Sequence, residues 1–307
     1  MSPSIWTLTC VFALATFPLS GQAACPDSRI GETAQDCPWA ELTRQASGKP
    51  LMPLLKQEVP EFAKMLEAEA RRAGWLNFWG RSLNFDEGAR SIIIADPLID
   101  ELLATFGAPA RQDRVVHAGV EHTYGYLFSV LRTPFGYKRA RWVKGEIERG
   151  LGLPDGIVSP RATEGGLLAN VTALGASIAL TDSRAWKEWV SKNPEIPTSL
   201  LVGSRADLKV QRLTEVTEGP NPIEIRTDFV EFPHASGSSN THLLVYSIRE
   251  RADSDPRLIT AFPVEKSFVE RAKDPAQLGS GKPIQTRYNA FVAGATGTPM
   301  KGTRSWK

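Results

Sequence analysis

Two of the four histidines in this chain, His117 and His122, lie close together in the segment HAGVEH. Imidazole titrates near neutral pH, so two histidines with different pKa values can act as general base and general acid in one reaction. The spacing does not fit the zinc-protease helix, which places its histidines four residues apart. The pair therefore favours metal-independent acid-base chemistry, for which we expect no metal and no cofactor.

A basic run follows the histidines and would supply the charge that such chemistry needs. Cleavage of a phosphodiester builds negative charge in the transition state, which the cations of Arg139 and Arg141 would stabilise. Aromatic rings interleaved with basic residues are typical of surfaces that stack bases. The expected ligand contacts are Tyr124, Tyr126, Trp142 and Lys144. The segment thus predicts a ribonuclease-like hydrolase that takes nucleic acid or a related phosphodiester.

The aromatic residues also fit a non-catalytic binding module. Trp75 and Trp79 would join Tyr124 and Tyr126 along a groove for a glycan or another small-molecule ligand. A purely structural role is a third alternative, because aromatic clusters belong to cores more often than to binding sites. The groove requires exposed rings, whereas the hydrolase requires both histidines at one pocket.

The amino terminus has the pattern of an export signal. An apolar run ends just before small residues that suit cleavage before Ala24. Removal of residues 1–23 leaves an even pair of cysteines, Cys25 and Cys37, which we expect to form a disulfide in an oxidising compartment. We expect the mature protein to be secreted or periplasmic, without stable insertion into a membrane.

The overall charge gives no reason to expect a polyanionic partner. The net charge is +2 over 307 residues, so any attraction to nucleic acid must come from a local basic patch. Apolar residues make up 42% of the chain, which suffices for a sizeable core.

Helix signals dominate the first half of the chain. Pro60 begins an amphipathic stretch that Gly74 ends, and Asp96 with Pro97 begins another. The apolar segment 167–180 is too short to cross a bilayer and predicts a buried helix.

Strand signals occur in both halves. Residues 122–131 alternate with a period of two, which predicts a strand, while 137–143 fits either a strand or a helix. The carboxyl-terminal half predicts an antiparallel meander with strands over 223–232, 243–249 and 258–264, followed by a short helix over 265–272.

These elements predict an α+β fold, in which amino-terminal helices pack on antiparallel sheet and a second antiparallel meander fills the carboxyl-terminal half. A Gly- and Pro-rich stretch over 151–166 predicts a long loop. The expected division of the chain is 1–23 signal peptide, 24–58 disulfide loop and surface extension, 59–191 mixed α/β half, 192–221 connection and 222–307 β-rich half.

Overall fold

The computed structural model describes residues 37–133, 136–160, 165–218, 220–234, 238–251, 254–273, 288–292 and 302–306. The expected signal peptide, residues 1–23, lies outside the described residues, as do Cys25 and the side chain of Cys37. Export and the Cys25–Cys37 disulfide therefore stay predictions.

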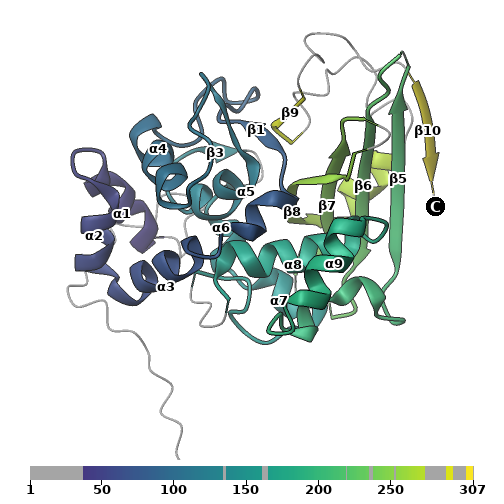
Figure 1. Cartoon of the computed structure of the whole chain (residues 1–307), viewed down its shortest axis with the longest axis horizontal. Coiled ribbons are helices and arrows are strands. Elements are labelled where there is room, and N and C mark those ends of the chain that lie inside the picture. The colour runs from purple at the N-terminus through teal and green to yellow at the C-terminus, as the bar shows by residue number, and fades with distance from the viewer. Residues whose placement is uncertain are drawn as a thin grey trace, which may run out of the picture.

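A helical part and a sheet part lie side by side in the molecule (Figure 1). The first half of the chain forms α1 (Cys37–Ala46), α2 (Leu51–Glu58), α3 (Pro60–Ala70), η1 (Ala73–Phe78), β1 (Arg81–Leu83), α4 (Asp96–Thr105), β2 (Val115–His117), α5 (Ala118–Val120), η2 (Glu121–Gly125), β3 (Arg132–Thr133), β4 (Gly136–Tyr137), α6 (Ala140–Val143) and α7 (Glu146–Leu151). The second half forms α8 (Leu167–Ala179), α9 (Arg184–Lys192), η3 (Thr198–Leu200), η4 (Val202–Ser204), β5 (Val210–Thr217), β6 (Glu224–Glu231), β7 (Asn240–Arg249), β8 (Arg257–Glu265), α10 (Lys266–Lys273), β9 (Ala290–Phe291) and β10 (Gly302–Trp306).

The largest sheet has five antiparallel strands in the order β10-β5-β6-β7-β8. Strands β5 to β8 form a meander, and β10 pairs with the outer side of β5. At the opposite edge, Leu258 of β8 forms a bridge with Trp79, and the Leu258 carbonyl accepts the Gly80 amide at 2.8 Å. This contact joins the sheet to the helical part, where β1 lies between β2 and β9.

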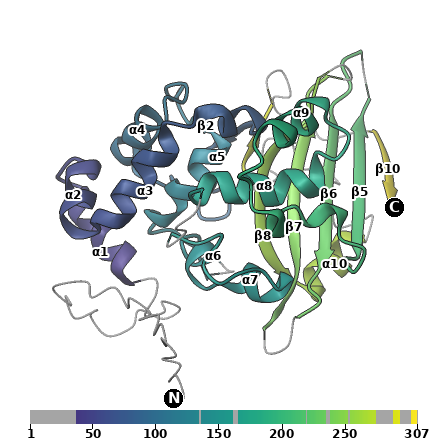
Figure 2. The same cartoon turned by 60° about the horizontal axis from the view of Figure 1, so that its bottom comes forward.

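Helices cover both faces of the five-stranded sheet. On one face lies α8 (Figure 2), and Val230, Leu243 and Val245 from the sheet join the main apolar core there. On the other face, Phe229 and Leu244 pack with Val269 of α10 in a second core. Strands β6 and β7 are therefore buried on both sides, whereas β5 is largely part-exposed.

Helix α8 occupies the centre of the molecule. All thirteen of its residues are buried, and it contacts α3, η2, η4, β7 and β8. Its apolar composition is explained by this position. Among the described residues, no helix combines the length and the apolar character that a bilayer crossing needs.

The predicted α+β class is confirmed. Helices α3 and α4 begin at Pro60 and Asp96, and α8 coincides with the predicted buried helix. Ala95, not Asp96, is the residue before α4. The meander over β6, β7 and β8 and the short helix α10 also follow the prediction.

Three local predictions were wrong. Residues 122–131 contain no strand, because the chain is helical from Ala118 to Gly125. The expected connection 192–221 contains β5, a full member of the sheet. The expected surface extension 24–58 contains α1 and α2, which bury Leu42, Leu51 and Leu55 in the main core. The undecided segment 137–143 ends β4 at Tyr137 and then forms α6.

The contact between α8 and η4 leaves no room for a side chain at Gly203. A Cβ at this position would overlap the carbonyl oxygen of Ser177, and the Gly203 amide donates to the Ser177 hydroxyl at 3.2 Å. We expect Gly203→Ala to lower the free energy of unfolding by roughly 1–3 kcal/mol, because the backbones must separate. Urea unfolding followed by circular dichroism would measure this. Gly48→Ala is the control, since Gly48 is exposed with no atom within 4 Å of an added Cβ, and equal stability losses in the two variants would contradict the prediction.

Candidate functional site

The histidine segment folds as a short helix, α5, that continues into a π-helical turn, η2. Every residue from Ala118 to Gly125 is buried, so the polar and apolar alternation has no solvent face to follow. A Cβ at Gly119 would overlap the ring of Trp79, so glycine permits the close approach of these two elements. Isolated π-helical turns occur frequently at functional sites.

Glu121 and His122 form a buried acid-base pair in η2. Oε2 of Glu121 lies 3.4 Å from Nε2 of His122 and accepts a hydrogen bond from the Ser82 hydroxyl of β1. The side chains of Glu121 and His122 are 0% and 1% exposed. Burial lowers the pKa of His122, because a low-dielectric surrounding disfavours imidazolium, and the ring is therefore neutral at pH 7.

Two cations lie near this pair, because the ring of Tyr126 contacts both of them as well as His122. The centroid of the Tyr126 ring lies 4.7 Å from the ring centroid of His122, 4.8 Å from Cζ of Arg141 and 5.0 Å from Nζ of Lys138. We define the Tyr126 cluster as Ser82, Glu121, His122, Tyr126, Lys138 and Arg141.

Arg141 reaches the Tyr126 cluster from α6 and also contacts β8. Its Nη1 donates to the Thr260 hydroxyl at 2.9 Å, and its Cζ lies 4.7 Å from the ring centroid of Phe262. Burial lowers the pKa of Arg141 to about 10, although the residue keeps some exposure to solvent. No carboxylate of the described residues forms an ion pair with this guanidinium.

Lys138 has a carboxylate partner at the rim of the cluster. Its Nζ lies 3.2 Å from Oδ2 of Asp86, and the two side chains are 13% and 18% exposed. Burial lowers the pKa of Lys138. The cluster therefore meets solvent on this side.

A tight turn before β9 covers Tyr126. The Asn289 side-chain amide donates to the Tyr126 hydroxyl at 3.3 Å, and the Asn289 carbonyl accepts the Leu83 amide at 2.7 Å. Tyr288 and Asn289 have φ angles of 53° and 62°, a left-handed conformation that side chains other than glycine adopt at some cost.

His117 has a structural role instead of the predicted partnership with His122. Its Nδ1 accepts the Val120 amide at 3.3 Å as the cap of α5, so the proton lies on Nε2, which is 3.1 Å from the Leu76 carbonyl. Burial lowers the pKa of His117 to about 4. Both ring nitrogens are engaged by the backbone.

The other predicted site residues are dispersed. Arg139 is fully buried and donates to the Ser129 carbonyl at 3.0 Å, and its Cζ lies 4.1 Å from the Tyr137 ring. The indole of Trp142 donates to the His122 carbonyl at 2.7 Å. Lys144 is half-buried and forms no hydrogen bond or ion pair with another described residue.

The four aromatic rings proposed for a groove are all buried. Trp75, Trp79, Tyr124 and Tyr126 are at most 6% exposed. They pack in the core, so a glycan-binding strip on these rings is wrong.

Tyr124 belongs to a buried cap at the start of α8. Its hydroxyl donates to Glu69 of α3 and accepts the Leu167 amide at 3.1 Å. The same carboxylate accepts the amides of Leu168, at 3.3 Å, and Ala169. Burial raises the pKa of Glu69 to about 7, and the three hydrogen bonds offset part of this effect.

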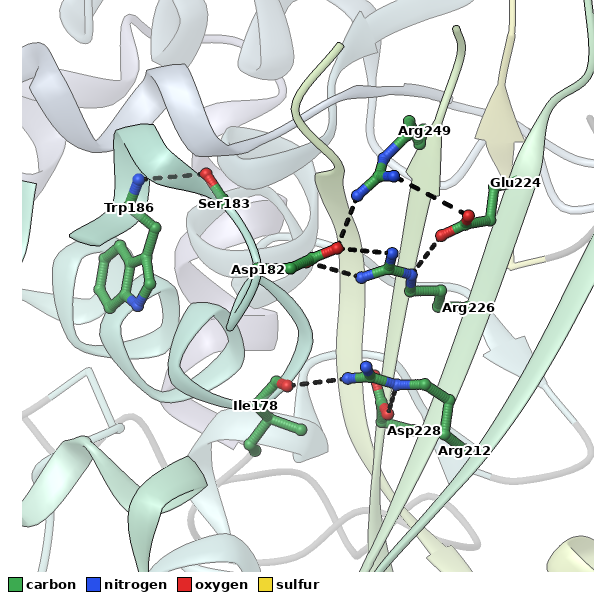
Figure 3. A network of polar contacts seen from close by, with 9 residues as sticks. All are labelled: Ile178, Asp182, Ser183, Trp186, Arg212, Glu224, Arg226, Asp228 and Arg249. Carbon is green, nitrogen blue, oxygen red and sulfur yellow. Dashed lines mark hydrogen bonds and ion pairs between the residues drawn. The ribbon is translucent and has the colours of Figure 1, made fainter. Parts of the chain in front are cut away.

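A second polar network ties the connection between α8 and α9 to the sheet (Figure 3). Asp182 accepts two hydrogen bonds from Arg226, each at 2.8 Å, and one from Arg249 at 2.7 Å. The bonds from Arg226 are the main reason why the pKa of Asp182 lies well below its usual range.

Arg212 extends this network along β5. It donates to Asp228 at 2.6 Å and to the Ile178 carbonyl at 3.1 Å, beside an open hollow of about 270 Å³. Each of the three arginines in the network has a carboxylate partner. The arginine charges of this network are therefore paired, in contrast to Arg141, while Oδ2 of Asp228 and Nε of Arg249 have no hydrogen-bond partner in the described part of the chain.

Sequence reasoning identified three members of the Tyr126 cluster as site residues: His122, Tyr126 and Arg141. It missed Ser82, which no local pattern marks and which reaches the cluster through the pairing of β1 with β2. Glu121 precedes His122 in the sequence and Lys138 precedes Arg139, so both could have been predicted as site residues from their neighbours.

Comparison of the chain with protein-family models, with curated proteins and with solved structures gives no match.

The buried cap at Glu69 should make stability depend on pH. Because its folded pKa of about 7 exceeds the value of about 4.5 for a free glutamate, the folded state binds more protons between these pH values. The contribution of Glu69 to the free energy of unfolding is fully present below about pH 4.5. It falls by roughly 3 kcal/mol as the pH rises to about 7. We expect Glu69→Gln, which stays neutral, to remove this part of the slope in urea unfolding at pH 5, 6, 7 and 8. Glu61→Gln on the exposed side of α3 is the control, and an unchanged slope in Glu69→Gln would contradict the assignment.

Proposed function

We propose that this protein binds a small anionic molecule, a carboxylate or a phosphate ester, at Arg141. The observation that carries the proposal is the largely buried guanidinium without a carboxylate partner among the described residues. Glu121 attracts this guanidinium without forming an ion pair with it, and burial still dominates. An anionic ligand in direct contact would offset more of the cost of the buried charge.

The surroundings of Arg141 favour recognition along one edge of the guanidinium. The rings of Tyr126 and Phe262 lie near its Cζ, and Nη1 is engaged by Thr260. Donors along the opposite edge suit two oxygens of one carboxylate or phosphate, which arginine binds in a bidentate manner. Lys138, one ring away, provides a second positive charge.

Burial of the cluster favours a small ligand over a polymer. Glu121 and His122 lie beneath the surface, so a nucleic acid strand has no path to them, whereas a small molecule can enter at the partly exposed Lys138–Asp86 pair. This supports the binding-module alternative in a modified form, with a charged site in place of an aromatic groove. The export pattern of residues 1–23 supports a secreted or periplasmic setting.

Removal of the Arg141 charge should weaken binding specifically. We expect the full chain to bind acetate, inorganic phosphate or ethyl phosphate, and Arg141→Gln to raise the dissociation constant by about tenfold or more. Calorimetry or NMR titration measures this. The matched control is Arg114→Gln, because Arg114 also lies over a ring, that of Phe85 at 4.3 Å, but is exposed. Equal affinity in the wild type and Arg141→Gln, or no binding of all three anions, would refute the proposal.

A second candidate function is metal-independent hydrolysis of a small phosphodiester. The observation that favours it is the neutral His122 ring, which has Glu121 against one nitrogen and two cations nearby. A neutral imidazole can accept a proton from an attacking hydroxyl, while Arg141 stabilises the developing charge. Since His117 is engaged by the backbone, a single histidine would serve as base and then as acid.

Hydrolysis can be tested with 2′,3′-cyclic CMP and methyl 4-nitrophenyl phosphate in the presence of chelator. We expect turnover to persist with chelator and to fall by about 10²-fold or more in His122→Gln. The exposed His234 provides the control variant His234→Gln, which should keep full turnover. No turnover in the wild type, or equal turnover in His122→Gln, would eliminate the hydrolase and leave the binding function.

A further inference from the structure

Three polar atoms at the base of the Tyr126 cluster have no hydrogen-bond partner among the residues that the structure describes. Oε1 of Glu121 and both ring nitrogens of His122 are buried without one, and Nε2 has only the 3.4 Å contact with Oε2 of Glu121. Buried polar atoms in folded proteins are nearly always paired, so such atoms at a site require an explanation. They lie below a ring that also contacts Lys138 and Arg141.

The surroundings of His122 determine which kind of group these atoms would meet. The polar atom nearest to Nε2 is the Glu121 carboxylate oxygen at 3.4 Å, which can only accept, so the negative charge of Glu121 favours the imidazole proton on Nε2 although the two atoms form no hydrogen bond. Nδ1 is then an acceptor with a free lone pair. Oε1 of Glu121 is an acceptor as well. The base of the cluster therefore offers acceptors, while Arg141 and Lys138 offer donors.

We propose that the ligand of this site carries a hydroxyl or amino donor next to its anionic group, and that His122 binds this donor through Nδ1. Hydroxy acids, amino acids and amino- or hydroxyalkyl phosphates belong to this class. The inference rests on the proposed anion site at Arg141 and adds the second half of the ligand. Glu121 and Ser82 act as positioning residues, because they hold the His122 tautomer.

The turn at Tyr288 and Asn289 contacts the cluster at the Tyr126 hydroxyl. Its side-chain contact with the cluster is the long hydrogen bond from Asn289 to the Tyr126 hydroxyl, and both residues have left-handed backbones. Backbone strain of this kind is often found where a segment clamps a ligand.

Matched ligand pairs test the proposal. Lactate and propionate differ by one hydroxyl, and O-phosphoethanolamine and ethyl phosphate differ by one amino group. We expect the full chain to bind the first member of each pair about tenfold more tightly, as one hydrogen bond to a buried acceptor would give. In His122→Phe, which keeps a ring against Tyr126, the two members of each pair should bind equally.

The outcomes separate this inference from the proposed function. If both members of each pair bind the wild type equally, and Arg141→Gln weakens all of them, the donor requirement is wrong and the anion site stands. If Arg141→Gln weakens none of the four, both proposals fail.

A spectroscopic measurement covers the case in which His122→Phe fails to fold. In ¹⁵N NMR of the wild type, we expect the resonances of His122 to indicate protonation at Nε2, and Nδ1 to shift with lactate but not with propionate. In Glu121→Gln the preference for this tautomer should weaken, which a loss of packing alone would not produce. Protonation at Nδ1 in the wild type would overturn the proposal.

Discussion

Complete burial of α8 is the constraint on which the rest of the structure depends. None of its residues meets water, so its first amide groups need protein acceptors, which Glu69 and Tyr124 supply from other elements. The sheet packs on one side of this helix and the helical part on another. Segment 118–125 lies between them without a solvent face, which is why its period-two pattern does not produce a strand.

The sequence predicted elements with strong local signals and failed where tertiary burial decides. Pro60 and Pro97 mark helix starts that hold in the structure, and the hairpin of β7 and β8 follows its strand pattern. Strand β5 was missed because its residues are mixed in polarity and lie between proline-rich stretches. At the site, the basic run predicted Arg141. No spacing rule could show that Arg139, two residues away, is buried and donates to the Ser129 carbonyl.

Buried and half-buried arginines of this molecule differ in whether they form an ion pair with a carboxylate, and this difference sets Arg141 apart. Arg212, Arg226 and Arg249 each have a carboxylate partner, and their network joins the α8–α9 connection to the sheet. Arg141 has rings and a hydroxyl around it. A paired arginine stabilises a contact within the fold, whereas the proposed anion site rests on an arginine that forms no ion pair among the described residues.

The pairing of β10 with β5 bears on how the protein behaves at high concentration. Without β10, the edge of the large sheet would be the eight-residue strand β5, and an unpaired edge of this length is a template for association between molecules. With β10 in place, a five-residue strand covers residues 213–217 of this edge, and at the other edge the backbone of Trp79 and Gly80 contacts Leu258. The last described strand thus protects the sheet against edge-to-edge aggregation.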